Sequence, residues 1–553
     1  MKREKVKTDV LVVGSGLAAL SAAIEAKKNG VQVKLVSKGK VGKSGNTIIS
    51  GGGFSLCLPD DSNEDSLESH YQDTLRAGVY INDRQLLKKM ISEESKTFYE
   101  LQKYGLRFQK NREGLVKKKA PGHSYARFHT IEKGNGKATS LQSQGIILPL
   151  KKKAEDMGID LIENVTIVKL LVKDSKVIGA IGIDSNDEKI LVFEAKAVIL
   201  ATGGGGKIFS CTNNVRGMTG DAYALALEAG ARLRDMEFIQ FHPAMLVSPR
   251  ITFPTPLFNE GATLKNTDGE SFMKKYDPCG DMATRDIMAR AIFTEITQGK
   301  GINGSVYIDC SEVDTTILET RYEYFYRLVK RQKINFQRDY FRAHPVVHFI
   351  MGGVLIDTEC KTDIEALFAA GEAAGGVHGA NRLAGNALTE AAVFGRIAGQ
   401  KASEYVSNRN HYSNEVEIAA EPLIKSWDKL LEASRNDFEL EDIRKSIGEV
   451  MWNKVGLIRS EATLVEAKED ISSINSSLIK YRPNNIKELN SWLELQRMIL
   501  VSRAIVESSL KRKESRGAHY RTDFALKNDD YFGSILISRK DDDTFSLLLQ
   551  RIS

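Results

Sequence analysis

The chain has 553 residues, of which 78 are basic and 72 acidic, giving a net charge of +6. Charges of both signs are interspersed, so we expect no nucleic-acid partner. The sequence has no uninterrupted apolar run of about eighteen residues, so we expect no membrane span. The five cysteines are scattered without a Cys-x-x-Cys pair, which argues against a zinc or iron–sulfur site in this chain. With no apolar signal region in its first residues, the sequence favours a cytoplasmic protein with reduced thiols.

The first predicted element is an apolar strand over residues 8–13 that runs into a Gly-x-Gly-x-x-Ala motif and then a helix. This order directs backbone amides and the positive end of a helix dipole at one point, where a dinucleotide pyrophosphate can bind. Gly14 permits the tight turn, Gly16 lets the backbone approach a phosphate, and Ala19 lets the helix pack close to the strand. An ordinary strand–helix turn is the alternative interpretation.

The second predicted strand, residues 31–36, follows at the distance expected for a dinucleotide-binding unit. It ends in Ser37 and Lys38 instead of the acidic residue that usually binds the ribose. The Ser37 hydroxyl can still make that hydrogen bond, so the prediction of a dinucleotide site stands.

Three glycine-rich segments lie far apart in the sequence, and each follows a predicted strand end where small residues let the backbone approach a ligand. A long ligand that is contacted at several points suits three such loops, so FAD fits better than a mononucleotide. No second Gly-x-Gly-x-x-Gly follows a strand, so we expect electrons to come from a partner, a small donor or the substrate. The segments are residues 14–19 supported by 50–53, residues 202–206, and residues 367–372 continuing to 379–382.

Two further regions differ in pattern from this framework. Residues from about Phe238 to Ala343 are richer in aromatic and charged side chains and form a predicted insertion that could cover the flavin. From about Glu415 to Leu510, apolar residues recur at a spacing of three to four, which predicts helices.

Seven motifs then occur in a specific order along nearly the whole chain. With them the sequence resembles the flavoproteins of succinate dehydrogenase, fumarate reductase and L-aspartate oxidase, most of all a fumarate reductase or succinate dehydrogenase flavoprotein subunit. The motifs are ATGG at 201–204, TGD at 219–221, QFHP at 240–243, TRD at 284–286, HFIMGG at 348–353, GANRL at 379–383 and ESRGAH at 514–519.

The resemblance implies an α/β fold: a Rossmann-like FAD-binding domain, an inserted α+β capping domain and a C-terminal helical domain. The boundaries that we predict are 1–237 and 344–410 for the FAD-binding domain, 238–343 for the capping domain, 415–510 for the helical domain and 511–553 for a C-terminal tail.

The resemblance and the glycine motif together give a set of candidate FAD-binding residues. In the membrane-complex members of the family, a His at the position of Asn46 is bonded covalently to the flavin; an amide cannot form that bond, so we expect non-covalent FAD. The candidates are Gly14, Gly16, Ala19, Ser37, Lys38, Gly52, Gly53, Asp221, Glu372 and Leu388.

Four residues align with those that carry the family's chemistry. The resemblance implies that Arg285 donates or accepts the proton at one carbon while the flavin exchanges a hydride with its neighbour. Arg382 is suited to bidentate carboxylate binding, because a planar guanidinium does this better than an ammonium. His242 and His348 would bond the carboxylate oxygens.

The proton relay of the fumarate-reducing members is missing. Counting from His242 without gaps, Pro254 replaces a substrate-binding Thr, and Thr255 and Phe258 replace the Glu and Arg that relay protons. Either protons take another route, by Glu260 or water, or the enzyme acts on a less polar enoate and Phe258 lines its pocket.

A segment with Gly122, His123, Ser124 and Arg127 resembles one shared by aspartate oxidases and some soluble fumarate reductases. The oxidases have a Glu two residues before that Gly, near the amino group of the substrate. Ala120 stands here instead, which counts against aspartate as the substrate.

We therefore predict an FAD-dependent oxidoreductase that interconverts a saturated carboxylic acid and its enoate, with succinate and fumarate as the default pair. Lacking cysteine clusters, the chain is expected to pass electrons to a separate iron–sulfur subunit, by analogy with the family alone. Three alternatives remain: an L-aspartate oxidase, a reductase of a less polar enoate, and a non-catalytic FAD electron-transfer subunit, which the missing relay favours. The sequence leaves open the exact substrate, the physiological direction, the electron donor or acceptor and the oligomeric state.

Overall fold

The computed structural model describes residues 1–59, 65–112, 114–120, 122–132, 143–407, 415–432 and 439–552. Its largest sheet has the strand order β8-β2-β1-β11-β10-β9, and β18 pairs with residues 198–200 of β11. The parallel strands are β1 (Lys2–Val13), β2 (Val33–Ser37), β8 (Asp160–Glu163), β11 (Lys189–Leu200) and β18 (Leu367–Ala369), and the antiparallel ones are β9 (Val165–Lys173) and β10 (Lys176–Asp184).

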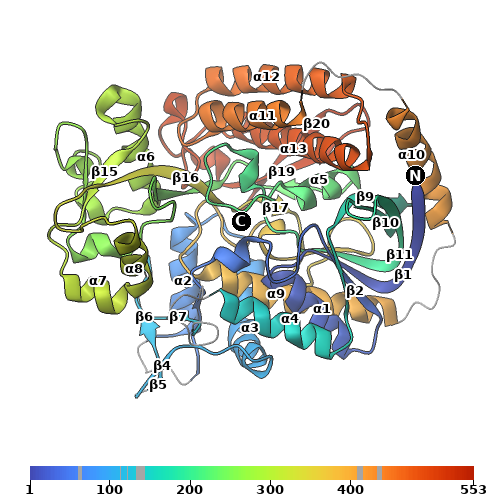
Figure 1. Cartoon of the computed structure of the whole chain (residues 1–553), viewed down its shortest axis with the longest axis horizontal. Coiled ribbons are helices and arrows are strands. Elements are labelled where there is room, and N and C mark those ends of the chain that lie inside the picture. Colours follow the sequence, from blue (N-terminus) through green and yellow to red (C-terminus); the bar gives the residue numbers. More distant parts are fainter. Residues whose placement is uncertain are drawn as a thin grey trace.

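Helix α1 (Leu17–Lys28) follows β1 directly and packs along α9 (Asn386–Ser407). Small residues make this contact close, because a Cβ added to Gly399 would lie 2.1 Å from the carbonyl oxygen of Ala22. Together with α4 (Gln144–Asp156), these helices cover one face of the large sheet (Figure 1). The strand–glycine–helix unit predicted from the sequence is therefore present.

A second unit, on the left in Figure 1, is built around a four-stranded antiparallel sheet. Two of its strands lead into and out of the first unit, so it is an insertion with a core of its own. The sheet order is β13 (Ile239–Leu246), β16 (Phe341–Ile350), β15 (Val306–Asp309) and β14 (Thr263–Lys265), accompanied by α6 (Arg285–Glu295), α7 (Thr315–Arg321) and α8 (Glu323–Arg331).

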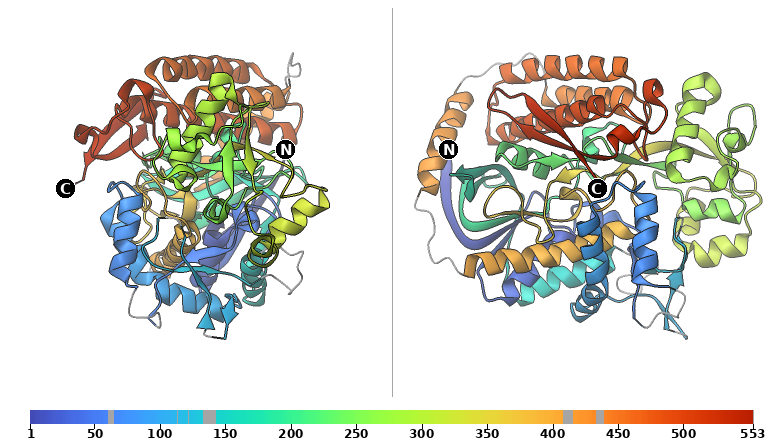
Figure 2. Two further views of the ribbon diagram at one scale, coloured as in Figure 1. Left: turned by 90° about the vertical axis from the view of Figure 1, so that its left-hand side faces the viewer. Right: turned by 180° about the vertical axis from the view of Figure 1, so that it is seen from behind.

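Three long helices, α11 (Leu440–Val455), α12 (Glu461–Lys480) and α13 (Ile486–Lys511), pack on one another along one side of the molecule (Figure 2). In contrast, α10 (Val416–Leu431) lies against strands of the large sheet. The C-terminal strands β19 (Gly533–Arg539) and β20 (Phe545–Arg551) join a small sheet with β12 (Leu233–Arg234) and β17 (Gly353–Val354).

This architecture confirms the predicted fold class, a Rossmann-like unit with an inserted α+β unit and a C-terminal helical unit. The domain boundaries drawn from the sequence stay predictions. Within the described ranges, no helix is both long and apolar enough to span a bilayer.

Candidate active site

A cavity of about 810 Å³ opens where the ends of β1 and β2 meet the inserted unit and the C-terminal helices. Its volume is within the range of ligand and cofactor sites. Two predicted site residues, the fully buried Ala19 and the buried His242, are outside its lining. The predicted residues that line it are Gly14, Gly16, Ser37, Lys38, Gly52, Gly53, Asp221, Arg285, His348, Glu372, Arg382 and Leu388.

The turn between β1 and α1 requires glycine at its first position. Gly14 has a φ of +134°, and an added Cβ would lie 2.1 Å from the carbonyl oxygen of Ala201. Gly16 then precedes the first turn of α1, where the Leu17 amide donates to Thr47 Oγ1 at 3.2 Å; the next amides of this turn and the helix dipole favour an anionic group here. The close approach of two backbones and a helix N-terminus fits a dinucleotide pyrophosphate.

Asp221 lies at one end of the cavity between two cations. Its Oδ2 accepts a hydrogen bond from Lys38 Nζ at 2.9 Å, and its Oδ1 accepts one from Arg497 Nε at 3.0 Å. Burial alone would raise the pKa of this carboxyl, but Lys38 and Arg497 outweigh that effect and lower it to about 2. Lys38 also forms an ion pair with Glu494 of α13. The carboxylate is therefore ionised and able to accept from a sugar hydroxyl.

Asn46 begins the short helix η1 (Asn46–Ile49) and is hydrogen-bonded at both ends of its amide. Its Nδ2 donates to Asn214 Oδ1 at 2.7 Å, and its Oδ1 accepts from the amide of Val215 at 3.1 Å. Asn46, at the position where other members of the family have the flavin-linked His, thus connects η1 to the segment around Asn214.

Arg285 is the first residue of α6, in the inserted unit, and its side chain reaches the cavity. Its Nη2 donates to Thr255 Oγ1 at 3.2 Å, and its buried Nε has no hydrogen-bond partner among the described residues. No described carboxylate forms an ion pair with it, and burial lowers the pKa of the guanidinium. Desolvation thus makes Arg285 a stronger acid than a free arginine.

Arg382 is held from three sides. Its Nη2 donates to Gln240 Oε1 at 2.8 Å, its Nη1 donates to the carbonyl oxygen of Leu383 at 3.3 Å, and the guanidinium carbon lies 4.7 Å from the ring centre of Phe349. Burial and the nearby Arg285 lower its pKa to about 10, so it stays protonated at neutral pH. Its buried Nε has no partner among the described atoms, and each Nη uses only one of its two N–H groups in these contacts, so donors at Nε and at both Nη atoms remain for a ligand.

The rings of His242 and His348 lie edge to face, with centroids 5.6 Å apart. Burial, together with the nearby guanidinium of Arg285, lowers the pKa of His242 to about 3; burial, Arg382 and His242 bring that of His348 well below its ordinary value. Both imidazoles are therefore neutral near pH 7. Asn213 contacts His348 at Nδ1, at 3.0 Å, so Nε2 of His348 is the ring nitrogen available to a ligand.

The structure shows the contacts of Thr255 and Phe258, which stand at the positions of the missing proton relay, and of the nearby Glu260. Thr255 contacts Arg285 directly, whereas Phe258 packs in the core of the inserted unit, with its ring centre 5.2 Å from that of Phe253. Phe258 is not part of the cavity lining, so the expectation that it lines a substrate pocket there is not supported. Glu260 forms an ion pair with Arg321 at 3.0 Å.

Several side chains that line the cavity or contact its lining residues were not singled out from the sequence. Gln240 lies inside a recognised motif, but a single sequence gives no signal that it orients Arg382. Asn213 and Asn214 precede the TGD motif and act through contacts that only the fold creates. The same holds for Glu494 and Arg497, which come from a helix more than 250 residues away from Asp221.

Comparison with known proteins extends this picture. The sequence matches the family described as FAD binding domain over residues 9–388 and the one described as fumarate reductase flavoprotein C-term over residues 444–551. A subunit of the fumarate reductase (CoM/CoB) of Methanothermobacter marburgensis is 37% identical over 98% of each chain. L-aspartate oxidase of Bacillus subtilis is 32% identical over 97% of this chain and 94% of its own. In structure, E. coli quinol fumarate reductase FrdA is similar at a TM-score of 0.91 and 25% identity, covering 100% of this chain and 97% of that one.

Glycine turns and the guanidinium groups of Arg285 and Arg382 in the lining of one cavity, together with the FAD-binding match, define an FAD-dependent oxidoreductase. The chain belongs to the fumarate reductase and succinate dehydrogenase flavoprotein family, in which L-aspartate oxidases are also relatives. The expected family and the expected cofactor, FAD, are thus confirmed. The cavity fits that cofactor, because its glycines leave room for the backbone to approach a long ligand.

Proposed function

We propose that this protein interconverts a saturated carboxylic acid and its enoate, with succinate and fumarate as the default pair. The observation that carries the proposal is that Arg285, His348 and Arg382, which are far apart in sequence, line one cavity together with the FAD-binding glycines. FAD, when bound, supplies hydride exchange with one carbon of the substrate.

Side chains of this protein carry out substrate binding and proton transfer. Arg382 binds a carboxylate through its free Nε and Nη donors, and neutral His348 donates or accepts at Nε2. Arg285 carries the proton on its guanidinium nitrogens and delivers it to the substrate carbon during reduction. Its lowered pKa assists that delivery, since general acid catalysis is most effective when the pKa of the acid approaches the working pH.

Reprotonation of Arg285 needs a route that differs from a Glu–Arg relay. Thr255 Oγ1 accepts from Nη2 of Arg285 and can pass a hydrogen bond on to water, whereas Phe258 has no exchangeable proton. We assign the route to water next to Thr255 and not to Glu260, because Glu260 is paired with Arg321.

We further propose that the electron partner is an iron–sulfur subunit. Among the described residues, no group of His, Cys, Asp or Glu side chains could hold a metal ion. Two relatives are named as subunits of larger enzymes, one in the fumarate reductase of Methanothermobacter marburgensis and one the succinate dehydrogenase flavoprotein of Rickettsia bellii. We infer that electrons leave or reach the flavin through such a subunit.

L-aspartate oxidase is the second candidate, because relatives with that name cover nearly the whole chain. The methyl group of Ala120 cannot pair with an ammonium group, which disfavours aspartate. Peroxide formation from aspartate and oxygen would favour this candidate over ours.

A panel of acids tests the function. The FAD-loaded protein is mixed with fumarate, succinate, aspartate and aryl-substituted acrylates, using reduced viologen as donor and a dye as acceptor. We expect viologen oxidation with fumarate and dye reduction with succinate. Lack of a response to every acid would overturn the proposal and favour a pure electron-transfer subunit.

Substitution of the proton donor gives a second test. We expect R285K to lower turnover roughly 10²- to 10⁴-fold with FAD content unchanged, the range typical for loss of a general acid. R290K is the matched control, because Arg290 lies on the same helix and pairs with Asp286 at 3.2 Å. Equal turnover in R285K and the wild type would contradict the assigned role.

A further inference from the structure

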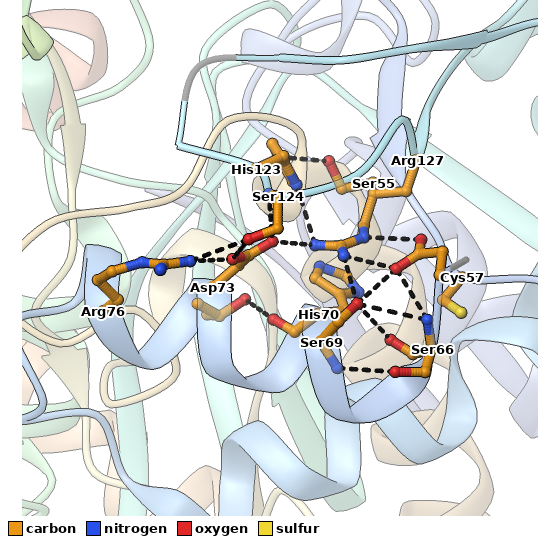
Figure 3. Close-up of polar contacts among 12 residues, drawn as sticks. Ser55, Cys57, Ser66, Ser69, His70, Asp73, Arg76, His123, Ser124 and Arg127 are labelled. Atoms are coloured by element: carbon orange, nitrogen blue, oxygen red, sulfur yellow. Dashed lines mark hydrogen bonds and ion pairs between the residues drawn. The ribbon is translucent and has the colours of Figure 1, made fainter.

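Figure 3 shows a polar cluster around Arg127; its His123 contacts the carbonyl of Ala384, in the turn that follows Arg382. It contains His123, Ser124 and Arg127, the segment that the sequence analysis singled out and that the proposed chemistry does not use. The other members come from β3 (Gly53–Ser55), from α2 (Leu67–Ala77) and from Asp65, just before that helix.

Arg127 is the centre of this cluster and is completely buried. Its Nε and Nη2 donate to the two oxygens of Asp65 at 2.9 and 2.6 Å, and its Nη1 donates to Asp73 Oδ2 at 2.7 Å. Burial alone would raise the pKa values of both carboxyls, but their hydrogen bonds, including those from Arg127, lower them. The guanidinium is thus fixed in position by two ionised partners.

Arg127 determines which nitrogen of His123 carries the proton. Its Nη1 also lies 3.3 Å from Nδ1 of His123, and a guanidinium can only donate, so Nδ1 is the acceptor. The proton of the neutral ring is therefore on Nε2, which lies 2.9 Å from the carbonyl oxygen of Ala384. Burial lowers the pKa of His123 to about 4, in agreement with a neutral ring.

The carbonyl of Ala384 consequently receives two hydrogen bonds, from His123 Nε2 and from Ser55 Oγ at 2.8 Å. Ala384 and Gly385 line the cavity two and three residues after Arg382. Gly385 has a φ of +84°, and a Cβ there would lie 2.1 Å from Ser55 Oγ, so this turn is pressed against β3.

The opposite side of the turn is held by the inserted unit. Gln240 accepts from Nη2 of Arg382 and donates from Nε2 to the carbonyl oxygen of Arg382 at 2.9 Å. The turn is thus fixed between Gln240 on one side and the cluster around His123 on the other.

We propose that His123 is a positioning residue that, through the carbonyl of Ala384, holds Arg382 in the orientation that binds a substrate carboxylate. The proposal rests on the proposed function for its substrate class and adds a residue that does not itself contact the cavity. Arg127, Asp65 and Asp73 act one step further back, by fixing the tautomer of His123.

Two variants separate the hydrogen bond from the bulk of the side chain. H123L removes the donor to Ala384, whereas H123Q retains an N–H that can reach it. R76Q is the matched control, because exposed Arg76 contacts Asp73 and Ser124 in the same cluster but neither His123 nor Ala384.

The readouts are the dissociation constants of fumarate and of malonate, from flavin absorbance, and KM and kcat with fumarate and reduced viologen. We expect H123L to weaken binding and raise KM by roughly tenfold, the effect of one hydrogen bond, with a smaller change in kcat and full FAD content. H123Q and R76Q should stay close to the wild type. Amide exchange of a peptide over residues 382–388 should be faster in H123L alone.

The outcomes distinguish this inference from the proposed function. If the wild type responds to these acids and H123L binds them equally well, the positioning role is wrong while the function stands. If the wild type responds to no acid, the function fails and the inference falls with it. Loss of binding in H123Q and R76Q as well would indicate a merely structural cluster and would also overturn the proposal.

Discussion

Both ends of the Asn46 amide are occupied by protein, by Asn214 and by the backbone of Val215. An amide is also not nucleophilic enough to form the flavin bond that an imidazole forms. We therefore predict that acid precipitation leaves a colourless pellet and releases all FAD into the supernatant, as measured by fluorescence. Yellow flavin that stays on the washed, denatured protein would contradict this prediction.

Glu372 is a half-buried carboxyl in the cavity lining whose pKa is raised from its ordinary 4.5 to about 7, first of all by desolvation. Its Oε1 accepts from the amide of Ile350 at 3.1 Å, and Gly204 packs against it. Because the folded state holds this proton more tightly, its contribution to stability is fully present below pH 4.5 and is lost as the pH rises through 7.

We predict that replacing Glu372 by Gln removes this part of the pH dependence. In the cofactor-free protein, wild type should lose a few degrees more of thermal stability than E372Q between pH 5 and pH 8, because only the wild type must ionise a desolvated group (~1.4 kcal/mol per pKa unit). Thermal melts of both proteins across that range measure the difference. Parallel curves would show that Glu372 does not titrate there.

At the scale of the element, α13 joins the C-terminal helices to the nucleotide end of the cavity. Arg497 contacts Asp221 at 3.0 Å, and Glu494 of the same helix pairs with Lys38. The Nη1 and Nη2 atoms of Arg497 are buried without a partner among the described residues, so its contact with Asp221 is what compensates its charge. The helix therefore contributes to the charge state of a candidate FAD ligand.

Replacing Arg497 by Met tests this contribution. We predict about a tenfold or greater loss of FAD affinity, since a hydrogen bond to a charged group is worth roughly 1.5–3 kcal/mol. FAD retained after dilution and gel filtration provides the measurement. R503M is the control on the same helix, because Arg503 pairs with Asp543 at 2.6 Å, away from the cavity lining. Equal losses in the two variants would point to general destabilisation of α13.

The sequence predicts elements whose signal is local and misses contacts that only the fold creates. The strand–glycine–helix unit at Gly14 follows from neighbouring residues, and the shared motifs bring Arg285, His348 and Arg382 to one cavity as expected. By contrast, the pairing of Thr255 with Arg285 depends on how a short helix in the inserted unit packs beside α6. Phe258 illustrates the same point, since the direction of its side chain is set by the core of that unit and it is absent from the cavity lining.

At the scale of the whole molecule, the cavity is lined by three parts of the chain; the inserted unit has a core of its own, whereas the C-terminal helices share a core with the large sheet. Val13 to Ala18 come from the large sheet and α1, Thr252 and Arg285 from the inserted unit, and Arg444, Ser491 and Glu494 from the C-terminal helices. A ligand that fills the cavity therefore contacts all three units at once. Binding energy that is shared in this way adds to the stability of each unit and of the contacts between them.

Thermal unfolding with and without FAD tests this coupling. Because FAD binds the folded state alone, free FAD at 100 times its dissociation constant should stabilise the protein by about 2.7 kcal/mol. If the three units share the ligand, FAD should raise the midpoint temperature of a single unfolding transition. Calorimetry and the fluorescence of Trp427 in α10, Trp452 in α11 and Trp492 in α13 should give the same increase. A split transition, in which FAD shifts one component and leaves the C-terminal helices melting unchanged, would show that those helices do not contribute to the cofactor site.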